Sequence, residues 1–209
     1  MKKLNVVCII PARKESKRIP RKNFKMFNGK PLIHYITQTA LNCKKIDRVI
    51  VSSNDLDLIG YCSKLGADTV VRPDSLSKNN SDINDAIKYT LDFLNVKADY
   101  IIILQTTSPL VSSETIDKDI EEFIKSNKKT CSTITPLLQN LNFLVTYNKQ
   151  KYIEDGNFTA INVNCNNDNH HYIETDYKKL TFFDIDWQPQ FDISEEIMKL
   201  LKNEKNQSI

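Results

Sequence analysis

No two cysteines in this 209-residue sequence have C-x-x-C spacing, and their total of five is odd. We therefore expect neither a disulfide framework nor a structural zinc site. The cysteines are interpreted as reduced packing residues of a cytosolic protein: Cys8, Cys43, Cys62, Cys131 and Cys165.

Long apolar runs are also missing, since no segment approaches the roughly 20 apolar residues that span a bilayer. The run from Val6 to Ile10 is too short for the core of a signal peptide and leads into Pro11, so it indicates a buried strand. The net charge of +3 is mild, and the Lys and Arg residues are scattered apart from one N-terminal cluster. This distribution argues against a nucleic-acid partner. We expect a cytoplasmic protein without a membrane partner.

What the sequence does contain is a regular alternation of strand and helix patterns, and no internal repeat. Strands are predicted at 5–10, 48–52, 69–71, 99–104 and 130–134, with helices at 31–42, 55–65, 81–94 and 114–126. This rhythm predicts an α/β fold with a Rossmann-like, doubly wound, mostly parallel sheet. The length suits one domain over 1–209.

The regular alternation fades after Pro136. The segment 151–163 indicates a strand pair or a β excursion, and 164–176 is polar and typical of a loop. A strand over 179–185 and a helix over 194–202 are predicted to close the chain.

Candidate ligand-binding segments follow the predicted strands, because open α/β sheets bind ligands beyond the carboxyl ends of their strands. The segment 11–23 comes directly after the first strand and carries six cations, Arg13, Lys14, Lys17, Arg18, Arg21 and Lys22, with Ser16 as a further donor. Such a loop suits a triphosphate, although a basic loop can also be only a solvated one. It lacks the Gly-Lys-Ser/Thr ending of a P-loop.

Three other segments hold polar groups at strand ends. Gln105 to Ser108 follow an apolar strand, where they either meet a ligand or form a Ser-Pro turn. Asp184 and Asp186 share one face of a predicted strand, so they either converge on a hard cation or are exposed carboxylates. Arg72, which is followed by a polar stretch over 74–84, either reaches a base or phosphate or pairs with a nearby Asp.

These segments together resemble the acylneuraminate (sialic acid) cytidylyltransferases. The family pattern I-P-A-R-x-x-S-K-R-[IL]-P-x-K-N is matched by residues 10–23, and G-K-P-[LM]-I by residues 29–33. Residues 104–110 resemble L-Q-P-T-S-P-L, and residues 184–186 resemble the late D-I-D of the family. The order and spacing hold from Val6 to about Asp119 and resume near Asp184.

The resemblance implies an enzyme that binds CTP with Mg²⁺, or Mn²⁺ in its place, and transfers CMP to a small acidic sugar as pyrophosphate leaves. A homodimer is also implied. The implied phosphate ligands are Arg13, Ser16, Arg18 and Lys22, next to Ala12, with Arg13 and Lys22 stabilising the charge of the transition state. Asn23 and Gln105 would face the cytidine or acceptor, Arg72 and Ser81 would border the base and ribose, and Asp184 and Asp186 would hold the metal, with Asp186 also catalytic.

Several positions depart from the family pattern. Glu15 stands where many members have Gly, Thr106 replaces a Pro, and Val111 replaces a common Arg. The acceptor and dimerisation region, 136–178, is short and poor in Arg and Lys. Its neighbouring histidines, His170 and His171, are more typical of a surface loop than of a metal site.

Two other functions stay open on the sequence. A glycosyltransferase of the GT-A kind would use Asp184 to Asp186 as its D-x-D motif, but a leaving diphosphate needs fewer cations than the loop supplies. A non-catalytic nucleotide-binding relative would account for Glu15 and the short acceptor region.

Overall fold

The structure, a computed structural model, describes residues 3–78, 80–136, 145–147, 150–166, 168–174 and 185–207. In this part of the chain the main sheet has eight strands, in the order β10-β7-β9-β6-β1-β4-β5 with β8 beside β9. The strands are β1 (Val6–Pro11), β4 (Arg48–Ser53), β5 (Asp68–Val71), β6 (Tyr100–Ile103), β7 (Thr130–Pro136), β8 (Val145–Tyr147), β9 (Gln150–Asn162) and β10 (His170–Glu174). A separate hairpin consists of β2 (Met26–Phe27) and β3 (Lys30–Pro31).

Parallel pairing dominates the half of the sheet that starts the chain. β1 lies between β4 and β6, with Cys8 opposite Val49 on one side and Ile102 on the other. β9 runs antiparallel to both β6 and β7, and β10 runs parallel to β7. The predicted α/β fold with a doubly wound, mostly parallel sheet is confirmed.

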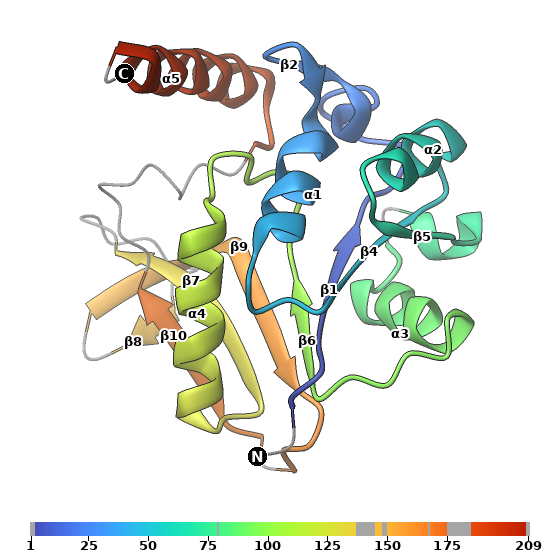
Figure 1. Ribbon diagram of the computed structural model, residues 1–209, viewed down its shortest axis with the longest axis vertical. Coiled ribbons are helices and arrows are strands. Elements are labelled where there is room, and N and C mark those ends of the chain that lie inside the picture. Colours follow the sequence, from blue (N-terminus) through green and yellow to red (C-terminus); the bar gives the residue numbers. More distant parts are fainter. Residues whose placement is uncertain are drawn as a thin grey trace.

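Five α-helices accompany the sheet in the described residues (Figure 1). They are α1 (Leu32–Asn42), α2 (Leu56–Lys64), α3 (Ile83–Phe93), α4 (Ser113–Ser126) and α5 (Gln188–Gln207), with short 3₁₀ helices η1 (Lys22–Phe24) and η2 (Asp74–Ser77). Side chains cap two of these helices: Asp55 accepts from the N–H of Asp57 at 3.1 Å, and Ser112 accepts from the N–H of Thr115 at 3.2 Å.

The side chains of β1 alternate between two cores, as expected for a strand covered on both faces. Cys8 and Ile10 face one side, where α1, α2 and α4 contribute apolar residues such as Ile36, Leu58 and Phe123. Val7 and Ile9 face the other side, against α3. Burying one such large apolar side chain stabilises the fold by roughly 1.5–3 kcal/mol. These cores fix the strand ends that carry the site.

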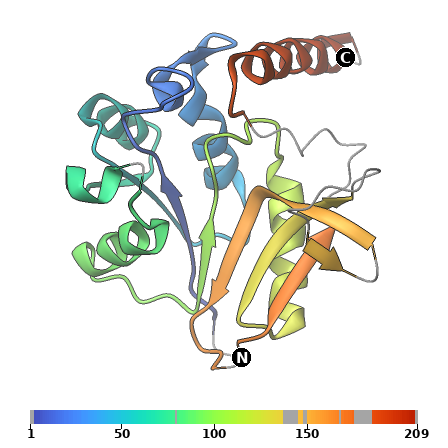
Figure 2. The same cartoon turned by 180° about the vertical axis from the view of Figure 1, so that it is seen from behind.

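The expectations after Pro136 are only partly met. β9 belongs to the main sheet, where the sequence indicated a strand pair or an excursion, and β8 does pair with it. The loop expected over 164–176 is wrong at His170–Glu174, which form β10 at the sheet edge (Figure 2). β10 forms because the backbone N–H and C=O groups at the edge of β7 need hydrogen-bond partners. A polar segment can supply them, since the pairing is made by the backbone. The strand predicted over 179–185 does not extend to Ile185, which lies in the link before α5. The other residues of that prediction, 179–184, lie outside the described part of the chain.

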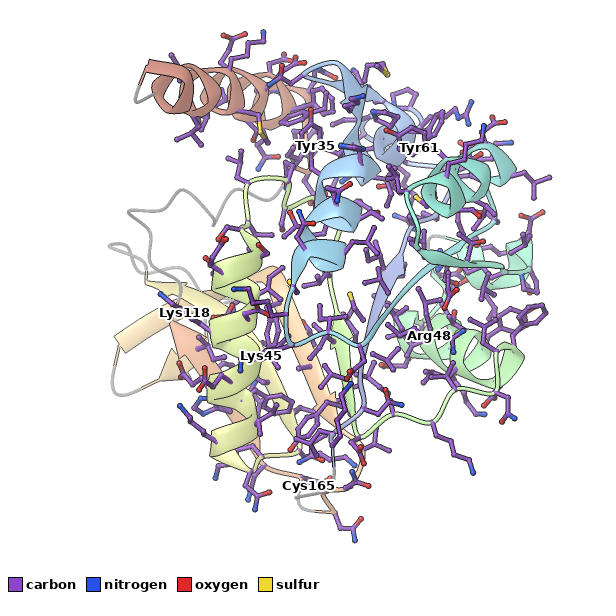
Figure 3. All side chains as sticks on the ribbon, in the orientation of Figure 1. Tyr35, Lys45, Arg48, Tyr61, Lys118 and Cys165 are labelled. Atoms are coloured by element: carbon purple, nitrogen blue, oxygen red, sulfur yellow. The ribbon has the colours of Figure 1, made fainter. Side chains whose placement is uncertain are left out.

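The hairpin β2–β3 and α5 lie at the end of the sheet where β1 and β6 have their carboxyl ends (Figure 1). The Tyr35 hydroxyl donates to the carbonyls of Phe27 at 2.8 Å and Asn28 at 3.0 Å, which ties the hairpin to α1. Figure 3 shows Tyr35 at the end of α1 near α5, and Cys165 at the opposite end of the molecule. Phe27 and Phe191 pack edge to face at 5.2 Å, so α5 rests on this hairpin.

The cysteines are all free thiols, as expected, and four of the five are buried. Within the described residues no helix is both long enough and apolar enough to cross a bilayer.

Candidate active site

A cavity of about 630 Å³ opens beyond the carboxyl ends of β1, β5 and β6. Its walls come from the loop after β1, the segment from Arg72 to Ala86, the residues after β6, and the link into α5. These segments meet because parallel strands bring their carboxyl ends to the same edge of the sheet. The volume is in the range of pockets that bind small-molecule ligands.

The loop after β1 is held by backbone hydrogen bonds on both sides of Arg13. The N–H of Ala12 donates to the carbonyl of Ser52 at 2.9 Å, and the N–H of Lys14 donates to Asn54 Oδ1 at 2.9 Å. Because β4 thus fixes the loop, the side chains of Arg13, Ser16, Lys17, Arg18 and Lys22 line the cavity.

Two cations of this loop meet one carboxylate from the far end of the chain. Asp186 forms ion pairs with Lys22 Nζ at 3.1 Å and with Arg18 Nη2 at 2.7 Å. Lys22 Nζ also donates to the carbonyl of Ile185 at 2.5 Å, and the N–H of Ile185 donates to the carbonyl of Thr107 at 2.9 Å. Lys22 is 9% exposed, so this ammonium is held in the cavity wall.

The side-chain amide of Gln190 orders the link into α5. Gln190 Oε1 accepts the N–H of Asp186 at 2.8 Å and the N–H of Trp187 at 2.7 Å. This arrangement caps the start of α5 and leaves the Asp186 carboxylate directed at the loop cations. Trp187 lies at the mouth of the cavity, and the Arg18 guanidinium stands 5.1 Å from its ring centre.

Arg72 is a buried cation in the opposite wall, 5% exposed. Its Nε donates to Ser77 Oγ at 2.9 Å, while its Nη1 has no hydrogen-bond partner among the described residues. Burial, with the nearby charge of Arg13, lowers the pKa of Arg72 to about 10. A buried donor without an acceptor costs free energy, so this group is suited to a ligand acceptor.

The structure brings most of the predicted site residues to this one cavity. Its wall includes Arg13, Ser16, Arg18, Lys22, Asn23, Arg72, Ser81, Gln105 and Asp186. Ala12 is fully buried and is not among the lining residues. Asp184 lies outside the described residues.

Other predicted features lie away from the cavity. Glu15 is exposed and does not line the cavity. Arg21 turns to α2, where its Nη2 lies 2.8 Å from Asp55 Oδ2 and 3.0 Å from Asp57 Oδ2. His170 and His171 interact with Thr130 and Glu122, respectively, and neither lines the cavity.

Several of the lining residues were predicted only as members of a polar segment, over 74–84 or over 105–108, and were given no individual role. Ser77 orients Arg72, and Lys78 and Asp82 border the cavity from the same segment. No motif marks these residues; only their position after a predicted strand could have drawn attention to them. Thr107 is buried in the wall, and its Oγ1 has no hydrogen-bond partner in the described part of the chain.

A divalent cation fits the cavity on the chemistry of its donors. Asp186 is a carboxylate in the cavity wall with a side chain 36% exposed. Mg²⁺ is commonly bound by one or two carboxylates together with phosphate oxygens, so a single described carboxylate is compatible with it. Among the described residues no group of three or more His, Cys, Asp and Glu side chains forms a metal cage. The described residues alone therefore do not complete a metal site, and phosphate oxygens of a ligand would supply further donors.

Comparison with known proteins decides the family. A family model described as cytidylyltransferase matches residues 7–206. The chain belongs to the cytidylyltransferase family. It is accordingly a nucleotidyltransferase, and the predicted resemblance to the acylneuraminate cytidylyltransferases is confirmed as membership of a sugar-acid cytidylyltransferase family.

Curated relatives of this cytidylyltransferase include the pseudaminic acid cytidylyltransferase of Campylobacter jejuni, 35% identical over 155 residues, or 71% of this chain and 67% of the relative. The 3-deoxy-manno-octulosonate cytidylyltransferase of Chlorobium chlorochromatii is 31% identical over 136 residues, or 65% of this chain and 52% of the relative. The chain thus spans about two thirds of the first protein and about half of the second.

A solved structure supports the fold. The CMP:2-keto-3-deoxy-manno-octonic acid synthetase complexed with CTP superposes with a TM-score of 0.72 over 94% of this chain and 99% of that one. The sequences are 13% identical, so this likeness shows the fold.

Proposed function

We propose that this cytidylyltransferase transfers CMP from CTP to a sialic-acid-like 2-keto sugar acid and releases pyrophosphate. One observation carries the proposal: Arg18 and Lys22 of the loop after β1 meet Asp186 in one cavity beyond the sheet. Triphosphate binding needs clustered cations, and the reaction needs a carboxylate beside them that can share a metal with the phosphates.

The triphosphate would lie along the loop after β1. Arg13, Lys17, Arg18 and Lys22 line this wall, with Ser16 among them. Because the loop is tied to β4 on both sides of Arg13, these donors are held in place before the nucleotide arrives. Such pre-organised cations stabilise negative charge that develops on the α-phosphate and on the leaving group. We assign that role to Arg13 and Lys22.

The base would lie by Arg72 and the segment that carries Ser81. Arg72 Nη1, which has no hydrogen-bond partner among the described residues, supplies a donor for an acceptor atom of the base, and Ser77 holds its Nε at 2.9 Å. Ser81 already donates to the carbonyl of Ser75 at 2.8 Å. Its proposed contribution to the ribose pocket is therefore to shape the wall. Gln105 lines the cavity after β6, where it would meet the cytidine or the acceptor.

Asp186 would hold Mg²⁺, with Mn²⁺ as a substitute and Asp184 as the second ligand that the sequence suggests. When bound, the metal would neutralise phosphate charge and lower the pKa of the attacking hydroxyl. Asp186 now has Lys22 at 3.1 Å and Arg18 at 2.7 Å. A triphosphate would take over these two cations and leave the carboxylate free for the metal.

In the proposed reaction the anomeric hydroxyl of the sugar acid attacks the α-phosphorus of CTP. A P–O bond to the sugar forms, the P–O bond to the β-phosphate breaks, and the hydroxyl proton is lost. Catalysis of this kind depends mostly on position and electrostatics. The cations of the loop after β1 supply both.

The acceptor class is supported by the relatives, whose names specify pseudaminic acid and 3-deoxy-manno-octulosonate. The expected single domain over 1–209, the cytoplasmic location and the homodimer stay proposals. Light scattering on the purified chain tests the dimer, and a monomeric mass at micromolar concentration would contradict it.

Pyrophosphate release tests the proposed function. The chain is incubated with CTP, Mg²⁺ and a panel of acceptors that includes pseudaminic acid, 3-deoxy-manno-octulosonate and N-acetylneuraminic acid. We expect release that requires CTP, metal and one of the 2-keto sugar acids together. Hydrolysis of a nucleotide sugar, or no release with any acceptor, would contradict the proposal.

A further inference from the structure

Asn23 lies between the loop after β1 and the residues after β6. Its Nδ2 donates to the carbonyl of Arg13 at 2.8 Å, and its Oδ1 accepts from the hydroxyl of Thr106. Asn23 is 6% exposed and Thr106 is 5% exposed, so water does not easily replace either bond. Asn23 was expected to contact the cytidine or the acceptor. In addition to any such contact, it makes these two hydrogen bonds within the protein.

The direction of both hydrogen bonds follows from the carbonyl of Arg13. A carbonyl only accepts, so the NH₂ group of Asn23 must face it, and Oδ1 must face Thr106. The Thr106 hydroxyl is therefore the donor to Oδ1. Without this hydroxyl, the buried amide oxygen of Asn23 would lose its partner, and the amide would be held only at its NH₂ end.

The backbone at Arg13 is held from two directions. β4 and the residue that follows it hold the neighbours on either side, through Ala12 to Ser52 and Lys14 to Asn54. The amide of Asn23 holds the carbonyl of Arg13 itself. The Thr106 hydroxyl holds the other end of that amide, so it acts on Arg13 through one intermediate residue.

We propose that Thr106 is a positioning residue for Arg13 in the transfer of the nucleotidyl group. A proline at this position, which the family pattern has, offers no donor, so the hydroxyl is a feature of this chain. The inference rests on the proposed function, since Arg13 matters here through the phosphates it would bind. Thr106 itself lines the cavity, but its hydroxyl is committed to Asn23.

Thr106→Val tests the proposal because it removes the hydroxyl and keeps the shape. We expect kcat/KM for CTP to fall about tenfold, the change that corresponds to one lost hydrogen bond. Thr106→Ser keeps the donor and should restore kcat/KM to within about twofold of the wild type. In an Arg13→Ala background, Thr106→Val should have little further effect, because the two residues act through one contact.

Amide hydrogen exchange gives a readout that does not depend on turnover. Thr106→Val should speed exchange in residues 12–16 without an equal increase across the sheet. Thr133→Val is the matched control: Thr133 is 2% exposed on β7, away from the cavity wall, and its hydroxyl accepts the N–H of Phe158 at 3.2 Å. This control should lower Tm and leave exchange at 12–16 and kcat/KM at 25 °C unchanged.

The outcomes separate this inference from the proposed function. Unchanged kinetics and exchange in Thr106→Val, or a full tenfold loss that persists in the Arg13→Ala background, would overturn the role of Thr106. A wild-type chain that neither binds CTP nor releases pyrophosphate would contradict the proposed function, and with it the role of Thr106 in it. Failure of Thr106→Ser to restore kcat/KM would show that packing, and not the hydroxyl, matters at this position.

Discussion

Lys22 and Asp186, 164 positions apart in the chain, form an ion pair of 3.1 Å in the wall of one cavity. The first strand positions the lysine and the start of α5 positions the aspartate, whose N–H is accepted by Gln190. This pair brings the cationic loop and the late carboxylate of the D-I-D motif to the same place. The predictions below test what each partner contributes.

Replacing Asp186 with Ala is expected to lower Mg²⁺-dependent turnover by at least about 100-fold, because it removes the described carboxylate that a metal would use. CTP binding measured without metal should be as tight as in the wild type or tighter, since Arg18 and Lys22 lose their counter-charge. Steady-state kinetics and calorimetry check both. Asp192→Ala, which removes an exposed carboxylate on α5, serves as the control. Near-normal turnover in Asp186→Ala would refute the metal assignment.

Replacing Arg13 with Ala should lower kcat by about 100- to 1,000-fold, or roughly 2.7–4 kcal/mol, the loss seen when one pre-organised charge-stabilising donor is removed. Arg21→Ala removes the same charge from the same loop, but Arg21 pairs with Asp55 and Asp57 outside the cavity. That control should affect stability more than kcat. If Arg13→Ala changes only KM, Arg13 contributes uniform binding and its assigned role is wrong.

The buried thiols should resist modification in the native protein. Burial raises the pKa of Cys43 to about 12 and that of Cys62 to about 11, and burial also raises the pKa of Cys8 and Cys131. Because the thiolate is the reactive form, a thiol reagent at pH 8 should react rapidly with one site, Cys165, and with all five after denaturation. Cys165→Ser should abolish the rapid phase. Two or more rapid sites in the native chain would contradict this burial.

Asp47 should contribute stability that is lost in acid. Burial raises the pKa of its carboxyl, but bonds from Lys3 Nζ at 2.8 Å and the N–H of Val6 at 3.0 Å outweigh burial and hold the pKa below 3.8. A carboxyl with a lowered pKa in the folded state stabilises fully above its ordinary pKa and loses that contribution as pH falls through the folded value.

Urea unfolding of wild type and Asp47→Asn at several pH values checks this. The difference in free energy of unfolding should be full at pH 7 and should shrink below about pH 3.8. A difference that stays constant down to pH 3 would show that the charge of Asp47 is not what stabilises the start of β1.

The first two thirds of the fold could be predicted from sequence because its elements carry local signals. β1 is an uninterrupted apolar run, and α2 has Asp55 at its start and Gly66, with φ of 99°, after its end. β10 has no such signal: His170 to Glu174 are mostly polar and lie among Asn residues, and they form a strand only because the edge of β7 is available. Pairing between distant segments is not encoded in local pattern.

The candidate site shows the same division. The motif and the strand positions predicted that the cationic loop and Asp186 would share a cleft, and the structure places them together. They did not predict which cations face it: Arg21 turns to Asp55, although it sits next to Lys22. They also could not show that Thr106 bonds Asn23, because that contact joins residues 83 positions apart.

Direct titration with CTP tests the central claim, that the cavity between the loop after β1 and Asp186 binds a nucleoside triphosphate. The single tryptophan of the chain, Trp187, is 57% exposed at the mouth of this cavity, so its fluorescence reports a ligand there. We predict a saturable change with CTP that weakens at least about tenfold in Lys22→Ala, where one charge-assisted contact to phosphate is lost. A wild-type signal that CTP leaves unchanged, together with no heat of binding in calorimetry, would contradict the account.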